Sequence, residues 1–154
     1  MGHNIVKVFL LVAISGILWL LYMVLSVKID GTDSYIKKAQ LDISDIKKAI
    51  INERQKRIFS SSDTRWINSL SKNRRVLFDG NDSTHKLLSI GILSGKKYGQ
   101  WETTDTKAPY KNYIFHLDSN LEVIFKYNDK NGTFDCLPYN KKDSGKICKK
   151  LLKL

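Results

Sequence analysis

Few residues of this chain have the types and spacing that catalysis requires. Its histidines, His3, His85 and His116, stand far apart and form none of the His-Glu motifs of zinc hydrolases. The stretch Gly91–Lys97 resembles a phosphate-binding loop, but it has one residue too few between its glycines. Lys97 also stands where such a loop needs a hydroxyl to bind magnesium. The sequence therefore predicts no enzyme, no cofactor and no metal site.

Two carboxylates lie close enough along the chain to suggest acid-base chemistry. Asp42 and Asp45 are three positions apart in a segment with helical periodicity, and Lys38, Lys47 and Lys48 surround them. Pairs of opposite charge at this spacing are typical of a solvated helix surface. We therefore predict an exposed ion-pair face here rather than a general acid and base.

The two cysteines, Cys136 and Cys148, are twelve positions apart near the end of the chain. A structural disulfide is the favoured interpretation, with two reduced thiols or half of a metal site as the alternatives. Disulfides persist in proteins outside the cytoplasm. The cysteines therefore favour an exported domain.

Basic residues exceed acidic ones by a wide margin. The 154 residues include 26 Lys and Arg against 15 Asp and Glu, which gives a net charge of +11. Solubility and nearness to anionic lipid headgroups explain such charge without a specific partner. DNA is the sharper hypothesis. The candidate contacts to an anionic partner are Arg54, Arg57, Arg74, Arg75, Lys141 and Lys142.

The composition is that of a folded domain with one appended element. A hydrophobic share of 42%, with 27% charged residues and two prolines, excludes a wholly disordered or collagen-like chain. The mean hydropathy of −0.29 excludes a protein with many membrane spans. Apolar residues are nevertheless concentrated at the start, so the chain is expected to have two parts, residues 1–30 and 31–154.

The first part contains an uncharged apolar run over residues 8–27. Twenty helical residues measure about 30 Å, which matches the hydrocarbon layer of a membrane. A transmembrane anchor that is not cleaved is favoured over a cleaved secretory signal and over a buried helix of a soluble domain. With the cysteines, this predicts a single-pass inner-membrane protein with a cytoplasmic N-terminus, a periplasmic domain and inner-membrane lipid as a partner.

The second part shows two periodicities in turn. Apolar residues at steps of three and four predict an amphipathic continuation of the helix to about Phe59; they are Ile36, Ala39, Ile43, Ile46 and Ile50. Residues 112–136 alternate strand-forming runs with turns, including Asn131-Gly132, and predict an antiparallel three-stranded meander. The predicted class is α+β: a long N-terminal helix, transmembrane then amphipathic, packed on a small meander and followed by a disulfide-closed C-terminal loop.

Several local strings resemble the type IV pilin and type II secretion pseudopilin superfamily across most of residues 31–154. The most specific is Phe125-Lys-Tyr-Asn-Asp-Lys-Asn-Gly-Thr-Phe-Asp-Cys136 with Ile147-Cys148-Lys149, and Gly99-Gln-Trp101 supports it. At the N-terminus, Gly16-Ile-Leu18 is similar to the Gly-Ile-Leu of the pilin helix. That register places a prepilin-type cleavage site between Gly2 and His3.

Two family positions differ in this chain. The register places Lys7 where the family has a glutamate, and Val24 where it has a helix-breaking proline. The family's glutamate neutralises a neighbour's N-terminal amine, which a lysine would repel. The resemblance therefore implies a non-enzymatic minor pseudopilin-like subunit, with other pilin-like subunits as partners, rather than a major pilin. A DNA-contacting component of an uptake system and a stand-alone anchored periplasmic protein are the alternatives.

Overall fold

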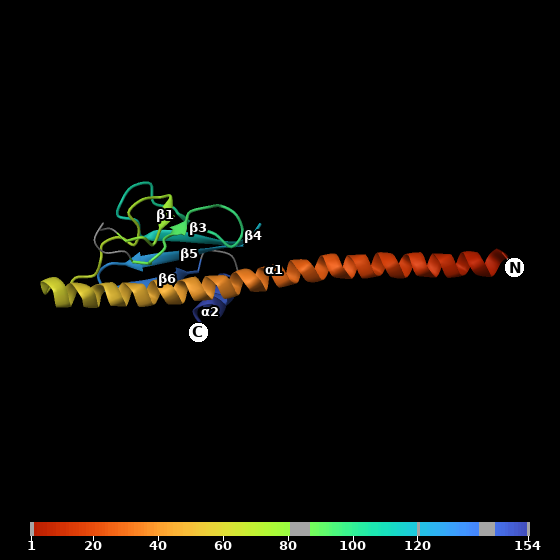
Figure 1. The fold of residues 1–154 in the computed structure, drawn as a ribbon, viewed down its shortest axis with the longest axis horizontal. Helices are drawn as coiled ribbons and strands as arrows, with labels where there is room; N and C mark the ends of the chain where they lie inside the picture. The colour runs from red at the N-terminus through yellow and green to blue at the C-terminus, as the bar shows by residue number, and fades with distance from the viewer. Residues whose placement is uncertain (1, 81–86, 120, 139–143, 154) are drawn as a thin grey trace. The chain divides into compact units, whose positions relative to one another are not determined.

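The computed structural model describes residues 2–80, 87–119, 121–138 and 144–153 (Figure 1). Within these ranges the side chains at 2–12, 24–32 and 144 are not described. The chain divides into two compact units, Met1–Ser34 and Tyr35–Leu154, so the boundary lies four residues beyond the predicted one. The protein is α+β, as predicted, but the predicted transmembrane half of its long helix is wrong.

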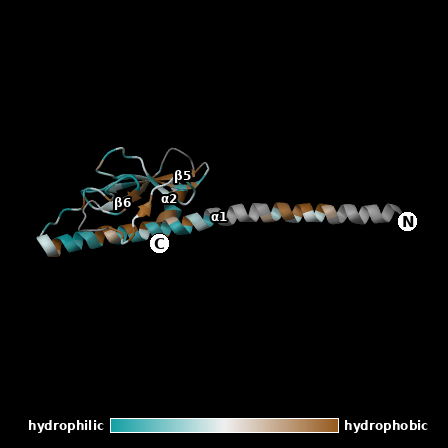
Figure 2. Ribbon diagram, turned by 45° about the horizontal axis from the view of Figure 1, so that its top comes forward, coloured by the Kyte–Doolittle hydropathy of each residue, from teal (hydrophilic) through white to brown (hydrophobic). Residues whose placement is uncertain are grey.

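Helix α1 runs from Gly2 to Ser61 and begins in the first unit. The side chains described there, at 13–23, form a mostly apolar stretch (Figure 2). Among the residues whose side chains are described, no helix is long and apolar enough to cross a membrane.

This finding contradicts the transmembrane first half that was predicted for the helix. The predicted span covered residues 8–27, of which 8–12 and 24–27 lie outside the described side chains. The single-pass inner-membrane location is contradicted with it. Inner-membrane lipid was expected as a partner on the same basis, and we do not carry it forward.

The second half of α1 is amphipathic, as its periodicity predicts. The predicted stripe of Ile36, Ala39, Ile43, Ile46 and Ile50 is buried in the core of the second unit, with exposed fractions of 8% or less. The helix ends at Ser61, two residues after the predicted end. Ser62 then adopts a left-handed φ of 57° and donates its N–H to the carbonyl of Ile58, which closes the last turn.

The sheet that covers this stripe is an antiparallel meander with the strand order β3-β4-β5-β6. Its strands are β3 (Trp101–Thr103), β4 (Asn112–Asp118), β5 (Leu121–Asn128) and β6 (Thr133–Leu137). The predicted meander over 112–136 is thus confirmed as β4 to β6. Strand β3 is a fourth strand that was not predicted, because three residues are too few to show an alternating strand pattern in the sequence.

The core between helix and sheet is aromatic. Trp101 packs edge-on against Phe115 and Phe125, with ring centroids 4.9 and 5.3 Å away, and Phe125 stacks on Phe134 at 5.2 Å. These rings are almost fully buried. Offset and edge-to-face contacts of this kind add to the stabilisation that burial gives.

A polar contact holds the helix to the first strand of the sheet. The indole Nε1–H of buried Trp101 donates to Oδ2 of Asp42 at 2.9 Å, and the ammonium of Lys38 lies 3.2 Å from the same oxygen. Lys38 also donates to the carbonyl of Gly99 at 2.7 Å. The predicted ion pair of Asp42 with a helix lysine is thus present, but the prediction missed that Asp42 also anchors the helix to Trp101. Asp45 is exposed.

A two-stranded antiparallel sheet joins β1 (Val76–Leu77) to β2 (Ile92–Leu93). A buried polar network anchors the loop before it. Ser71 Oγ accepts the N–H of Phe78 at 2.9 Å and lies 3.0 Å from the hydroxyl of Tyr113, which donates to the carbonyl of Tyr110. Burial raises the pKa of Tyr113 well above its usual range, so its hydroxyl stays protonated as a donor.

The described end of the chain is a helix. Cys136 and Cys148 form the predicted disulfide, but Cys148 lies on helix α2 (Ser144–Leu152). Leu151 of this helix is fully buried and Ile147 packs against the core. Gln40 of α1 donates to the carbonyls of Lys150 and Lys153 at 2.8 and 3.3 Å, so it caps the end of α2. The predicted loop is thus wrong from Ser144 onward, where nine residues give only a short amphipathic signal, and its residues 139–143 lie outside the described part of the chain.

Candidate functional site

The structure engages two of the predicted anion contacts in internal interactions. The Arg54 guanidinium lies 4.2 Å from the ring of Trp66 and its Nε donates to the carbonyl of Thr64. Arg57 Nε lies 3.4 Å from Oε1 of Glu53, and Glu53 is a buried residue with 3% of its surface exposed. Both arginines therefore stabilise the junction between α1 and the loop that follows it.

The neighbouring charges are paired in the same way. Arg65 donates from Nε and a terminal nitrogen to the two carboxylate oxygens of Asp63, and these hydrogen bonds lower the pKa of Asp63 to about 2. Lys111 lies 2.6 Å from Asp129 and lowers its pKa. A hollow of about 400 Å³ is lined by Arg57, Arg65, Trp66, Asn68 and Asp129. The arginines that line this hollow are already paired with carboxylates, so the hollow attracts an anion only weakly.

Arg74 and Arg75 are both exposed and lie on a bend before β1. Oδ1 of Asn73 accepts the N–H groups of Arg75 and Val76 at 2.8 and 2.9 Å. The two arginines line a hollow of about 490 Å³ together with Leu93, Ser94, Glu102 and Thr103. This bend is a better-presented basic surface than Arg54 and Arg57. The remaining predicted contacts, Lys141 and Lys142, lie outside the described residues. The predicted processing site at Gly2 and His3 lies at the start of α1, where no side chains are described.

One titratable cluster spans three strands of the sheet. Nε2 of His116 on β4 lies 3.3 Å from Oε2 of Glu102 on β3, and Nδ1 lies 3.1 Å from Oε1 of Glu122 on β5. Lys96 lies 3.6 Å from the other oxygen of Glu102. His116 is 7% exposed and both its ring nitrogens contact carboxylates, so neither nitrogen is presented to a reactant. This arrangement bridges strands rather than performs acid-base chemistry.

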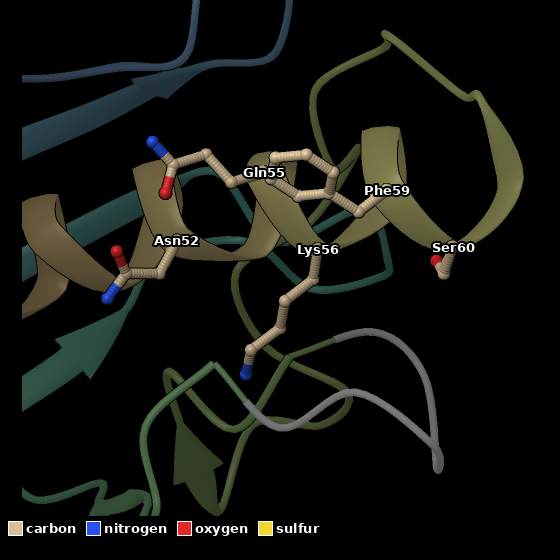
Figure 3. A pocket seen from close by; sticks show the side chains of 5 residues that line it. All are labelled: Asn52, Gln55, Lys56, Phe59 and Ser60. Atoms are coloured by element: carbon tan, nitrogen blue, oxygen red, sulfur yellow. The ribbon is translucent and has the colours of Figure 1, made fainter.

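The largest hollow that we describe lies on the last turns of α1 and has a volume of about 660 Å³. Figure 3 shows its lining residues, Asn52, Gln55, Lys56, Phe59 and Ser60, all carried by one helix. Every one is exposed, and Phe59 is 88% exposed. Side chains that fan out from a single helix do not converge on a small molecule. This surface can make contacts, but it has no catalytic constellation.

Metal-binding residues do not gather either. In the part of the chain that the structure describes, no three or more His, Cys, Asp and Glu side chains are placed to hold a metal ion. The two cysteines are joined to each other.

The most unusual surface belongs to the first unit. All side chains described at 13–23 are exposed, and eight of them are large and apolar with exposed fractions from 45% to 69%. These eight are Ile14, Ile17, Leu18, Trp19, Leu20, Leu21, Tyr22 and Met23. We call residues 13–23 the apolar segment. Because consecutive residues of a helix point about 100° apart, the run from Leu18 to Met23 surrounds the whole helix with apolar side chains.

No protein-family model, no curated protein and no solved structure matches this chain.

Proposed function

We propose that the chain is a non-enzymatic structural subunit, similar to a minor pseudopilin, of a type II secretion or type IV pilus-like machine. The observation that supports this most is the apolar segment. Soluble proteins rarely leave a contiguous apolar surface uncovered, and large exposed patches mark sites of association. Eight large apolar side chains of this segment are 45% to 69% exposed.

The distribution of apolar side chains around the segment sets the kind of assembly. A partner helix covers one stripe of its neighbour, as in a coiled coil. The apolar run from Leu18 to Met23 surrounds the helix, so one partner leaves the far side uncovered. Covering it requires two or more neighbouring helices. We therefore propose a bundle of pilin-like subunits that pack through this segment, as the resemblance implies.

Site-specific crosslinking tests this proposal. Leu18→Cys, at a position that is 61% exposed, is labelled with a thiol-reactive benzophenone, and illumination is expected to crosslink it to a second copy or to another pilin-like subunit. Leu93→Cys is the control, because Leu93 is 73% exposed but lies in the second unit. Equal crosslinking at both positions, or none at Leu18, would refute assembly through the apolar segment.

The residue at position 7 gives a second test of the same proposal. The resemblance places a glutamate there in relatives, and this chain has a lysine. We expect Lys7→Glu to increase the crosslinking of Leu18→Cys to other pilin-like subunits, because the new carboxylate attracts a neighbour's N-terminal amine. A product pattern unchanged by the substitution would remove the charge argument for a minor rather than a major subunit.

A further inference from the structure

Lysines that are far apart in the sequence form one basic surface where α2 packs beside α1. On α2 and just after it, Lys146, Lys149, Lys150 and Lys153 are exposed at helical spacing. Gln40 joins this helix to α1 by its two hydrogen bonds to the carbonyls of Lys150 and Lys153. Figures 1 and 2 show α2 beside α1 in the second unit.

The face of α1 that carries Gln40 extends this charge. Lys37 precedes Gln40 by three residues and Lys47 follows it by seven, so both lie on its side of the helix. Lys37 is exposed and Lys47 is half-buried. We call the six residues Lys37, Lys47, Lys146, Lys149, Lys150 and Lys153 the lysine surface.

From this arrangement we propose that the lysine surface binds the phosphate backbone of DNA without reading its sequence. Duplex DNA carries one charge about every 1.7 Å along its axis, so several phosphates face a helix of α2's length. An ammonium group is a point charge that contacts phosphate from any direction, whereas base recognition favours the planar fork of arginine. Six lysines therefore match a backbone better than a base sequence.

The composition of the surface favours nucleic acid over an acidic protein. The centres of protein interfaces are rich in aromatic residues and depleted in lysine. Binding to a DNA backbone needs charge alone and is more polar. The apolar side of α2 is used inside the protein, where Leu151 is fully buried and Cys148 is 7% exposed. What α2 presents outward is mainly ammonium groups.

The surface is also held in place before any partner binds. The disulfide fixes α2 to β6, and Gln40 fixes its end to α1. Ordering a flexible lysine tail on DNA would cost conformational entropy, which a docked helix has already lost on folding. This inference does not depend on the proposed pilin-like assembly, because it uses contacts of the second unit alone.

The test measures how salt weakens binding of the full chain, kept dispersed in a nonionic detergent, to a fluorescent 20-base-pair duplex. Each phosphate neutralised contributes about −0.9 to the slope of log K against log salt concentration. In the first variant Lys146, Lys149, Lys150 and Lys153 are changed to Gln. We expect its slope to be smaller in magnitude by about 3 to 4, on the same relation.

A matched variant removes the same net charge elsewhere. Lys56, Lys72, Lys107 and Lys130 are exposed lysines of α1 and of three loops, and their change to Gln is expected to leave the slope within about 1 of wild type. Equal losses in both variants would show that overall charge alone attracts DNA, and would overturn the proposal.

Two further measurements keep the result decisive. If the α2 variant loses its folded circular dichroism spectrum, Lys37→Gln with Lys47→Gln replaces it, with an expected slope change of about 2. An unchanged slope there would overturn the proposal. Poly-glutamate serves as the acidic protein probe. A wild-type chain that binds poly-glutamate through the lysine surface, but not the duplex, would overturn the assignment to DNA in favour of a protein partner.

Discussion

The contact between Asp42 and Trp101 gives the sharpest test of how the helix is held to the sheet. Trp101 has no exposed surface, and its indole N–H donates to Asp42 at 2.9 Å. Asp42→Ala removes that acceptor and leaves a buried donor unsatisfied, which costs about 1–3 kcal/mol. It also removes the pair with half-exposed Lys38, worth about 0.3–0.5 kcal/mol.

We therefore expect Asp42→Ala to lower the free energy of unfolding by about 1.5–3 kcal/mol. Asp42→Asn keeps an acceptor oxygen for the indole, so its cost should stay below about 1 kcal/mol. Asp45→Ala is the matched control, because Asp45 is an exposed carboxylate on the same helix, and its effect should lie within about 0.5 kcal/mol of zero.

Urea unfolding of the full chain, followed by far-ultraviolet circular dichroism, measures these differences. A double-mutant cycle with Trp101→Phe isolates the hydrogen bond itself, with an expected coupling energy of about 1.5–3 kcal/mol for a bond to a charged group. If Asp42→Ala is no more costly than Asp45→Ala, or if the coupling energy is near zero, the contact does not anchor the helix and our reasoning is wrong.

Three further predictions concern the sheet and the end of the chain. Changing Cys136 and Cys148 to Ser should lower the free energy of unfolding, measured with urea, by about 3 kcal/mol, which is the loop-entropy value for a separation of 12 residues. A loss below about 1 kcal/mol would show that Leu151 and Gln40 hold α2 in place without the disulfide. Gly132→Ala should cost more than about 2 kcal/mol, because the residue has a φ of 72° and its new Cβ would lie 2.2 Å from Trp66; an unchanged melting temperature would contradict this. Burial raises the pKa of Tyr127 far above its usual value, so its contribution to stability is complete below about pH 10 and declines as pH rises further. The free energy of unfolding should therefore fall less steeply above that pH in Tyr127→Phe than in the wild type, and equal slopes would contradict the prediction.

The parts of the fold that the sequence predicted correctly depend on local periodicity. The isoleucine stripe of α1 repeats at helical spacing over fifteen residues, and each member of the stripe is buried. The runs that became β4, β5 and β6 are separated by turn residues, and Gly132 takes the left-handed φ that an Asn-Gly turn needs. Such patterns act through neighbours in the chain, so they are visible without a structure.

The cysteine pair could be predicted for a different reason. A small domain with two cysteines near its end has one possible internal disulfide, and Cys136 and Cys148 form it. Composition did not show that Cys148 lies on a helix, because α2 has too few residues for a strong helical period. Its position depends on Leu151 in the core and on Gln40, which is 110 residues earlier than the carbonyl of Lys150.

The apolar run at the start illustrates where hydropathy misled. The length of residues 8–27 predicted a membrane span, whereas no helix among the described residues is long and apolar enough to cross a membrane. An apolar run reports that a helix needs cover, but not what covers it.

Contacts between distant residues decided the rest. Asp42 and Asp45 have the same type and nearly the same sequence neighbourhood, yet one anchors Trp101 and the other faces outward. The cluster of Glu102, His116 and Glu122 forms because the register of three antiparallel strands places these residues side by side. The lysine surface forms because Gln40 binds the end of α2 to α1. A sequence determines which side chains are apolar, charged or turn-forming. Their partners across the sheet and between helices follow from burial of a shared core, which depends on the whole chain at once.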